Sequence, residues 1–101
     1  MVVTGVTSSG FEYSVNSGIT RDFEFVKAMR KTQDSSLSDF ERFDNVCYMI
    51  ECIFHDEKEE ERFYSFLADK SENKRADIDT VVREANEIIE AIAAKDKTAK
   101  K

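Results

Sequence analysis

Apolar and polar residues alternate near the start of the chain, which is the period of a β-strand with one buried face. The alternating apolar positions of this segment are Phe11, Tyr13 and Val15. A valine-rich stretch precedes them, and residues 8–10, Ser-Ser-Gly, form a typical turn sequence between the two. Residues 2–16 are therefore predicted to form a β-hairpin. Its apolar face is expected to pack on the rest of the domain, because an isolated hairpin is marginally stable in water.

The pattern changes after residue 18, where apolar residues recur at spacings of three and four, as on one face of an α-helix. Thr20 can cap a first helix, and Ser38 with Glu41 forms a capping-box signature for a second. Asp56 can cap a third helix, and a last one opens near Asp77. The predicted helices span residues 20–31, 38–54, 56–69 and 77–94.

The second predicted helix is apolar over most of its circumference, so it is expected to be the central and most buried element. Its stripe consists of Phe40, Phe43, Cys47, Ile50 and Phe54, and a further face consists of Val46, Tyr48, Met49 and Ile53. Residues 46–54 would also suit a buried strand, but the capping box and the heptad-like spacing favour a helix. The first helix has a shorter apolar stripe of Phe23, Val26 and Met29.

The last predicted helix has a wide apolar side. Its stripe consists of Ile78, Val81, Ala85, Ile88 and Ile92, and Val82 and Ile89 widen it. Three glutamates, Glu84, Glu87 and Glu90, are expected to lie off this stripe. The helix is predicted to end at residue 94, where the apolar period ends.

A chain of 101 residues has the usual length of one domain and room for one core. The sequence predicts a mainly α (α+β) fold, in which an N-terminal β-hairpin packs on a bundle of about four helices. This single domain is expected to span residues 1–94. Residues 95–101 include four lysines and no apolar period, so they are predicted to form a disordered basic tail.

The charge balance narrows the classes of partner. Charged residues make up 36% of the chain and its formal net charge is -6, so the surface is densely ionic and acidic overall. Nucleic acid is not an expected partner, because nonspecific affinity for phosphates comes from lysine and arginine. No stretch has the length and apolarity of a membrane span, and residues 1–5 lack the start of a signal peptide. The protein is expected to be cytoplasmic.

No catalytic constellation or cofactor motif can be assembled from these residues. The only histidine, His55, follows Cys47 and Cys52 in the sequence, and a metal-dependent enzyme using all three is the weakest alternative. The two cysteines point about 140° apart on a helix, and their spacing is not that of a structural zinc site. They are expected to be buried free thiols. The acidic run of residues 56–61 lacks the ligand pattern of a calcium loop and is predicted to be a solvated helix start.

The aromatic content, eight Phe and three Tyr, offers the best candidate for a binding surface. Phe63, Tyr64, Phe66 and Leu67 lie together in the third helix, and one short helix cannot turn all four inward. The exposed part of this segment, together with the end of the last helix at Ile89 and Ile92, is predicted to contact a protein partner. Packing of the same residues in the core is the competing interpretation.

The order of these elements resembles that of the tail assembly chaperones of long-tailed bacteriophages and prophages. The resemblance covers the strand at residues 10–15, the capped helix that begins at residues 20–24, the central apolar helix, residues 63–67 and the closing helix. It implies a non-enzymatic, α-rich protein that binds the tape measure protein and recruits tail tube subunits. It also implies a location in the cytoplasm of the bacterial host, absence from the mature virion and a possible association with itself.

One alternative shares the small size and acidity. A small regulatory module, such as an antitoxin or an inhibitor, would bind one globular enzyme with one-to-one stoichiometry. Multimers, or several copies on one long client, would favour the chaperone.

Overall fold

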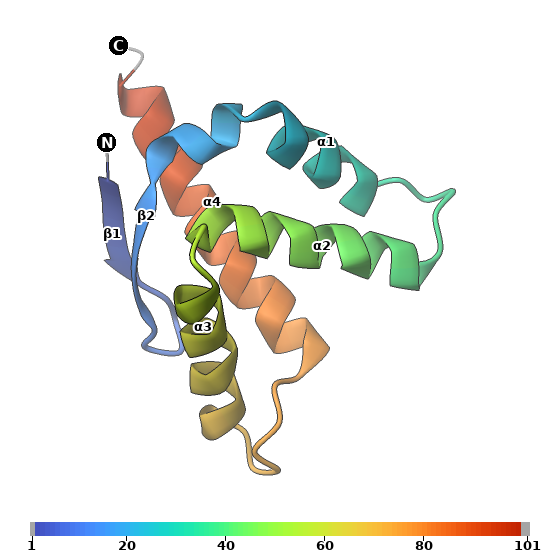
Figure 1. The fold of residues 1–101 in the computed structure, drawn as a ribbon, viewed down its shortest axis with the longest axis vertical. Coiled ribbons are helices and arrows are strands. Elements are labelled where there is room, and N and C mark those ends of the chain that lie inside the picture. Colours follow the sequence, from blue (N-terminus) through green and yellow to red (C-terminus); the bar gives the residue numbers. More distant parts are fainter. Residues whose placement is uncertain (1, 100–101) are drawn as a thin grey trace.

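The computed structural model describes residues 2–99, in which a two-stranded antiparallel sheet is followed by four α-helices (Figure 1). The strands are β1 (Val2–Val6) and β2 (Glu12–Asn16), and a 3-10 helix, η1 (Ser17–Arg21), follows them. The α-helices are α1 (Phe23–Thr32), α2 (Asp39–Phe54), α3 (Glu57–Lys70) and α4 (Ile78–Ala99). The predicted fold class, an N-terminal hairpin on a helical bundle, is confirmed.

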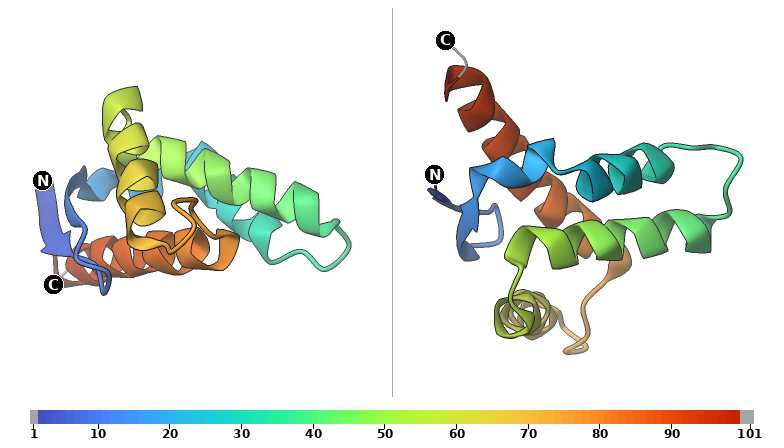
Figure 2. Two further views of the ribbon diagram at one scale, coloured as in Figure 1. Left: turned by 90° about the horizontal axis from the view of Figure 1, so that it is seen from below. Right: turned by 45° about the horizontal axis from the view of Figure 1, so that its top comes forward.

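The helices form a flat assembly with α2 in the middle. In Figures 1 and 2, α1 lies on one side of α2 and α3 on the other, while α4 crosses behind them. The whole fold measures 45 × 34 × 22 Å. Helices α1 and α2 run antiparallel and project together as an arm away from the hairpin, which lies at the opposite end beside α3 and α4 (Figure 1).

The hairpin has the register that the alternation of its residues requires. Val3 pairs with Val15 and Gly5 with Tyr13 across the two strands, and Val3, Tyr13 and Val15 are buried. The ring of Tyr13 lies over Gly5, where a Cβ atom would come within 2.5 Å of the tyrosine hydroxyl oxygen. Glycine is therefore required at this position so that the aromatic ring can cross the opposite strand.

Side chains cap the helix starts largely as the sequence predicts. Ser38 and Glu41 form a complete capping box at α2, and the side chain of Asp56 accepts from the backbone N–H of Lys58 at α3. The expectation for α1 was wrong, because Asp22 rather than Thr20 is its cap. The residues just before Asp22 form η1, which delays the start of α1.

Phe11 joins the hairpin to two helices through a cluster of aromatic rings. Its ring centroid lies 5.1 Å from that of Phe63 on α3, 5.4 Å from that of Phe66 and 6.1 Å from that of Phe54 at the end of α2, all edge-on. The guanidinium of Arg62 covers the ring at 4.5 Å from its centroid. Edge-on aromatic pairs of this kind add about 0.5–1.5 kcal/mol each to the free energy gained from burial.

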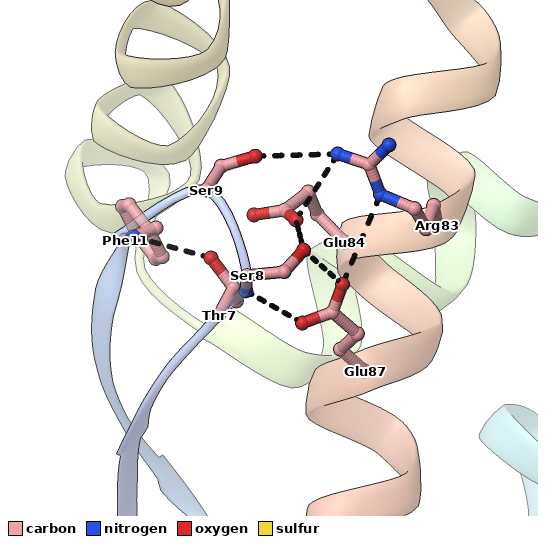
Figure 3. A network of polar contacts seen from close by, with 7 residues as sticks. All are labelled: Thr7, Ser8, Ser9, Phe11, Arg83, Glu84 and Glu87. Atoms are coloured by element: carbon pink, nitrogen blue, oxygen red, sulfur yellow. Dashed lines mark hydrogen bonds and ion pairs between the residues drawn. The ribbon is translucent and has the colours of Figure 1, made fainter.

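The hairpin turn is also bound to α4 by a polar network (Figure 3). The backbone N–H of Ser8 donates to Glu87 at 2.7 Å, and its hydroxyl lies 2.6 Å from Glu87 and 3.0 Å from Glu84. A hydroxyl carries one proton, and the shorter distance selects Glu87 as its acceptor. These bonds hold the pKa of Glu87 below its usual value. Arg83 completes the network at 3.2 Å from the hydroxyl of Ser9.

The prediction for Glu84 was wrong. Its side chain is 0% exposed and lies under the hairpin turn, not off the apolar stripe. Arg83 lies 3.5 Å from one oxygen of this carboxylate, and the other oxygen has no hydrogen-bond partner among the described residues. Glu84 lies on the same side of α4 as Val81 and Ile88. Its polar neighbours come from the hairpin turn, which is distant in the sequence, so the periodicity of the helix could not reveal them.

Burial along α1 and α2 also differs from the predicted stripes. Phe23 and Phe40 are 74% and 84% exposed, whereas Phe25 and Ala28 form the buried side of α1. Only the second half of α2, from Met49 to Phe54, contributes fully buried residues. Helix α2 is central, as expected, but the expectation that it is the most buried element holds only for its second half. Its first half lies in the projecting arm, where α1 is its main neighbour.

The last helix continues past the predicted domain boundary at residue 94. Helix α4 extends to Ala99, so it includes most of the segment that was expected to be a disordered tail, and residues 100–101 lie outside the described residues. Lysine and alanine favour helix formation, and basic residues near a helix C-terminus interact favourably with its dipole. Its apolar stripe is otherwise as predicted, except that Ile78 is 50% exposed.

We expect Ser8→Ala to lower the free energy of unfolding by about 1–3 kcal/mol at neutral pH, because it removes the hydrogen bond from the Ser8 hydroxyl to Glu87. Because the folded pKa of Glu87 is depressed, this stabilisation is full above its ordinary value of 4.5. The stabilisation is lost as the pH falls through the pKa that Glu87 has in the folded protein, which is lower. Urea unfolding at several pH values measures both effects, and Ser14→Ala, at an exposed strand position, is the control. A difference that grows with acidity would contradict this account.

Candidate functional site

A groove of about 360 Å³ opens where α1 and α2 meet α4. Apolar side chains line most of it, namely Met29, Val46, Met49, Val82, Ala85 and Ile89. Polar side chains complete the lining, namely Thr32, Gln33, Asn86 and Glu90. The groove thus combines an apolar lining with hydrogen-bonding groups, the usual composition of a binding site.

The groove exists because α2 and α4 have more apolar surface than their mutual packing covers. Ala85 and Met49 are buried, whereas Val46 and Ile89 pack against the core with part of their surface still exposed. Val82 also lines an adjoining solvent-exposed hollow on α4, so it stands at the edge of the groove. These are the residues that made the apolar sides of both helices unusually wide in the sequence. That width is the signal for the groove.

The chemistry of the groove favours binding over catalysis. Glu90 is the only ionisable residue among the described lining residues, so there is no acid and base pair to transfer a proton. Met29 and Met49 have flexible, polarisable side chains, which adapt to apolar partners of different shape. An apolar groove between helices accepts the apolar face of an amphipathic helix, with anchors at helical spacing.

Half of the predicted binding residues lie in the core. Phe63, Leu67 and Ile92 are 0%, 1% and 0% exposed, so they have no free surface for a partner in this fold. Phe63 belongs to the aromatic cluster around Phe11, and Ile92 continues the buried stripe of α4. For these three residues the core interpretation was the correct one.

The other three predicted residues are half-buried, and the fold does not bring them together. Phe66 packs edge-on against Phe11, and the ammonium of Lys70 lies 5.3 Å from its centroid. Tyr64 is hydrogen-bonded to Glu60, and burial is the main reason why its pKa is raised. Ile89 alone lines the groove. Of the six predicted residues, only Ile89 is among the described residues that line the groove.

The two cysteines are free thiols with unreactive surroundings. Both are half-buried on α2. Burial raises the pKa of Cys47, and the carboxylates of Asp44, Glu51 and Glu60 raise it further. Burial is also the largest cause that raises the pKa of Cys52. Because the thiolate is the nucleophile and the metal ligand, this environment disfavours both kinds of chemistry.

The histidine and the acidic run have structural roles at the junction of α2 and α3. His55 is exposed and ends α2 in a left-handed conformation, with φ 56°. The acidic residues of α3 lie in its first turn, where they complement the helix dipole. Among the described side chains of residues 2–95, no group of three or more His, Cys, Asp or Glu is arranged to hold a metal ion.

Comparisons with known proteins give no relative for this chain. No protein family model matches it, and searches of curated proteins and of solved structures gave no match. Among the described helices, none is long and apolar enough to cross a membrane.

The assignment of Phe63 to the core and Phe40 to the surface can be tested with one substitution at each position. We expect Phe63→Leu to lower the free energy of unfolding by about 1–3 kcal/mol, because a buried ring loses its close contacts. Phe40→Leu should change it by no more than about 0.5 kcal/mol, as is usual for an exposed position. Urea unfolding followed by circular dichroism measures both. Similar losses in the two variants would contradict the assignment.

Proposed function

We propose that this chain is a non-enzymatic protein-binding module that takes an apolar helical segment of another protein into the groove between α1, α2 and α4. The observation that carries the proposal is the groove itself, whose apolar lining comes from helix faces wider than the core requires. An amphipathic helix would bury its apolar side there, and Gln33, Asn86 and Glu90 could bond to its polar edges.

Within this class we propose the role of a tail assembly chaperone. Its support is the order of elements, in which a hairpin precedes a capped short helix, a long apolar helix and a closing helix. A tape measure protein is long and helical, and its apolar stripes would aggregate unless they were covered. A small acidic domain bound along such a client would cover the stripes, and its net charge of -6 would keep the complex soluble. The recruitment of tail tube subunits and a location in the bacterial cytoplasm belong to the same proposal.

We expect Val82→Asp to weaken client binding by at least about tenfold, because it places a charge at the edge of an apolar groove. Ile78→Asp is the matched control, since Ile78 is an exposed apolar residue of the same helix that does not line the groove. Each variant is co-expressed with the proposed client, a tape measure protein. Co-purification then reports binding, and circular dichroism reports folding.

Equal losses in the two variants would contradict the groove as the binding site.

The mass of the purified complex separates the two functional candidates. Several copies of the chain on one long client support the chaperone. A complex of one copy with one globular enzyme would favour the inhibitor or antitoxin and overturn the more specific proposal.

A further inference from the structure

The outer face of α1 carries three cations beside an exposed aromatic ring. Phe23 is 74% exposed, and its ring centroid lies 6.0 Å from the ammonium of Lys27. Arg30 and Lys31 follow on the same side, and all four residues line a groove of about 550 Å³. We call these four residues the basic face. Among the described residues, no carboxylate forms an ion pair with its three cations.

The basic face points away from the core. Lys27 and Arg30 each follow a buried residue, Phe25 and Ala28, by two positions, which is a rotation of about 200° around the helix. Asp34 borders the same groove. Its carboxylate accepts the backbone N–H and the hydroxyl of Ser36 at 2.9 and 2.6 Å, so it is held within its own turn. The three cations are therefore left facing solvent.

A complementary surface lies across α2 and α3. It consists of Asp44, Glu51, Glu57, Glu60 and Glu61, which we call the acidic face. Among the side chains that the structure describes, those of residues 2–95, none of these carboxylates forms an ion pair. Burial raises the pKa of Glu60, and repulsion from Glu51, Glu57 and Glu61 raises it further. A cation brought to this face would relieve that repulsion.

The two faces cannot meet within one molecule. Helix α2 contacts both α1 and α3, and it lies between them in the views of Figures 1 and 2. The basic face is on the side of α1 turned away from the core, and most of the acidic face is on α3, across α2. Charge pairing between them therefore requires a second copy of the chain.

We propose that the basic face of one copy binds the acidic face of a second copy. Phe23 is the apolar anchor of this contact, since a large aromatic ring at an interface centre contributes more than the surrounding charges. The charges steer the encounter and fix its orientation. Because the two faces differ, the contact is head-to-tail and leaves one face of each kind free at the ends, so copies add in a row. The contact does not use the groove, so it stands independently of the proposed function.

Charge reversal tests the contact on the full-length protein. One variant carries Lys27→Glu with Lys31→Glu, and a second carries Glu57→Lys with Glu61→Lys; all four positions are exposed. The control carries Arg75→Glu with Lys95→Glu, two exposed positions outside both faces, and changes the net charge as the first variant does. Sedimentation velocity over a concentration series measures association at about 0.05 M and about 0.5 M NaCl, and circular dichroism checks folding.

We expect the average mass of the wild type to rise with concentration at low salt and to return to that of the monomer at high salt. Each charge-reversed variant alone should associate at least about tenfold more weakly, whereas the control should behave as the wild type. An equimolar mixture of the two variants should associate again, because each supplies the face that the other lacks.

Four outcomes would overturn the proposal. The first is a wild type that stays monomeric at low salt over the whole concentration series. The second is a closed dimer whose formation neither variant changes. The third is a mixture of the two folded variants that stays monomeric. A loss of client binding in the first variant, with self-association unchanged, would assign the basic face to another protein and would also overturn the proposal.

Discussion

The packing of Phe11 against α2 and α3 is the contact on which the rest of the structure depends. An isolated two-stranded hairpin is marginal in water, and this one is stabilised by the rings of Phe54, Phe63 and Phe66 on one side of its turn. The network of Ser8 with Glu84 and Glu87 fixes the same turn to α4. The turn thus joins three helices, and the core forms at this end of the molecule.

This concentration of the core at one end explains the surfaces at the other. The arm of α1 and α2 projects from the body, and Phe40, at the start of α2 near the tip of the arm, is left in solvent. Phe23, at the start of α1, is also exposed, because Phe25 and Ala28 form the buried side of that helix. Where the arm meets α4, the remaining apolar surface forms the groove that contains Val82 and Ile89. A small domain cannot bury all of its apolar surface. Here the excess is gathered in places where a partner could cover it.

Much of the fold could be predicted from the sequence because its signals are local. The capping box at Ser38 and Glu41 and the stripe through Ile88 and Ile92 involve neighbouring residues. The face of α1 that is turned toward the core could not be predicted, since Phe23 and Phe25 are both apolar and point about 200° apart around the helix. Glu84 is buried beneath the hairpin turn, which is distant in the sequence, so the helical period could not indicate it. The groove needed the relative placement of three helices, and only the wide apolar sides of two of them indicated it.

The unpaired charges on the two faces need not come at a large cost in stability. Exposed ion pairs contribute about 0–1 kcal/mol each, because water solvates the separate charges nearly as well as a partner does. With 15 basic and 21 acidic residues, the surface charges of both signs could have been mixed evenly. Instead, the cations on α1 lie apart from the carboxylates around Glu60, on another side of α2. Such segregation adds little to folding, but it creates a field that orients an approaching molecule before contact, which is where surface charge has its largest effect.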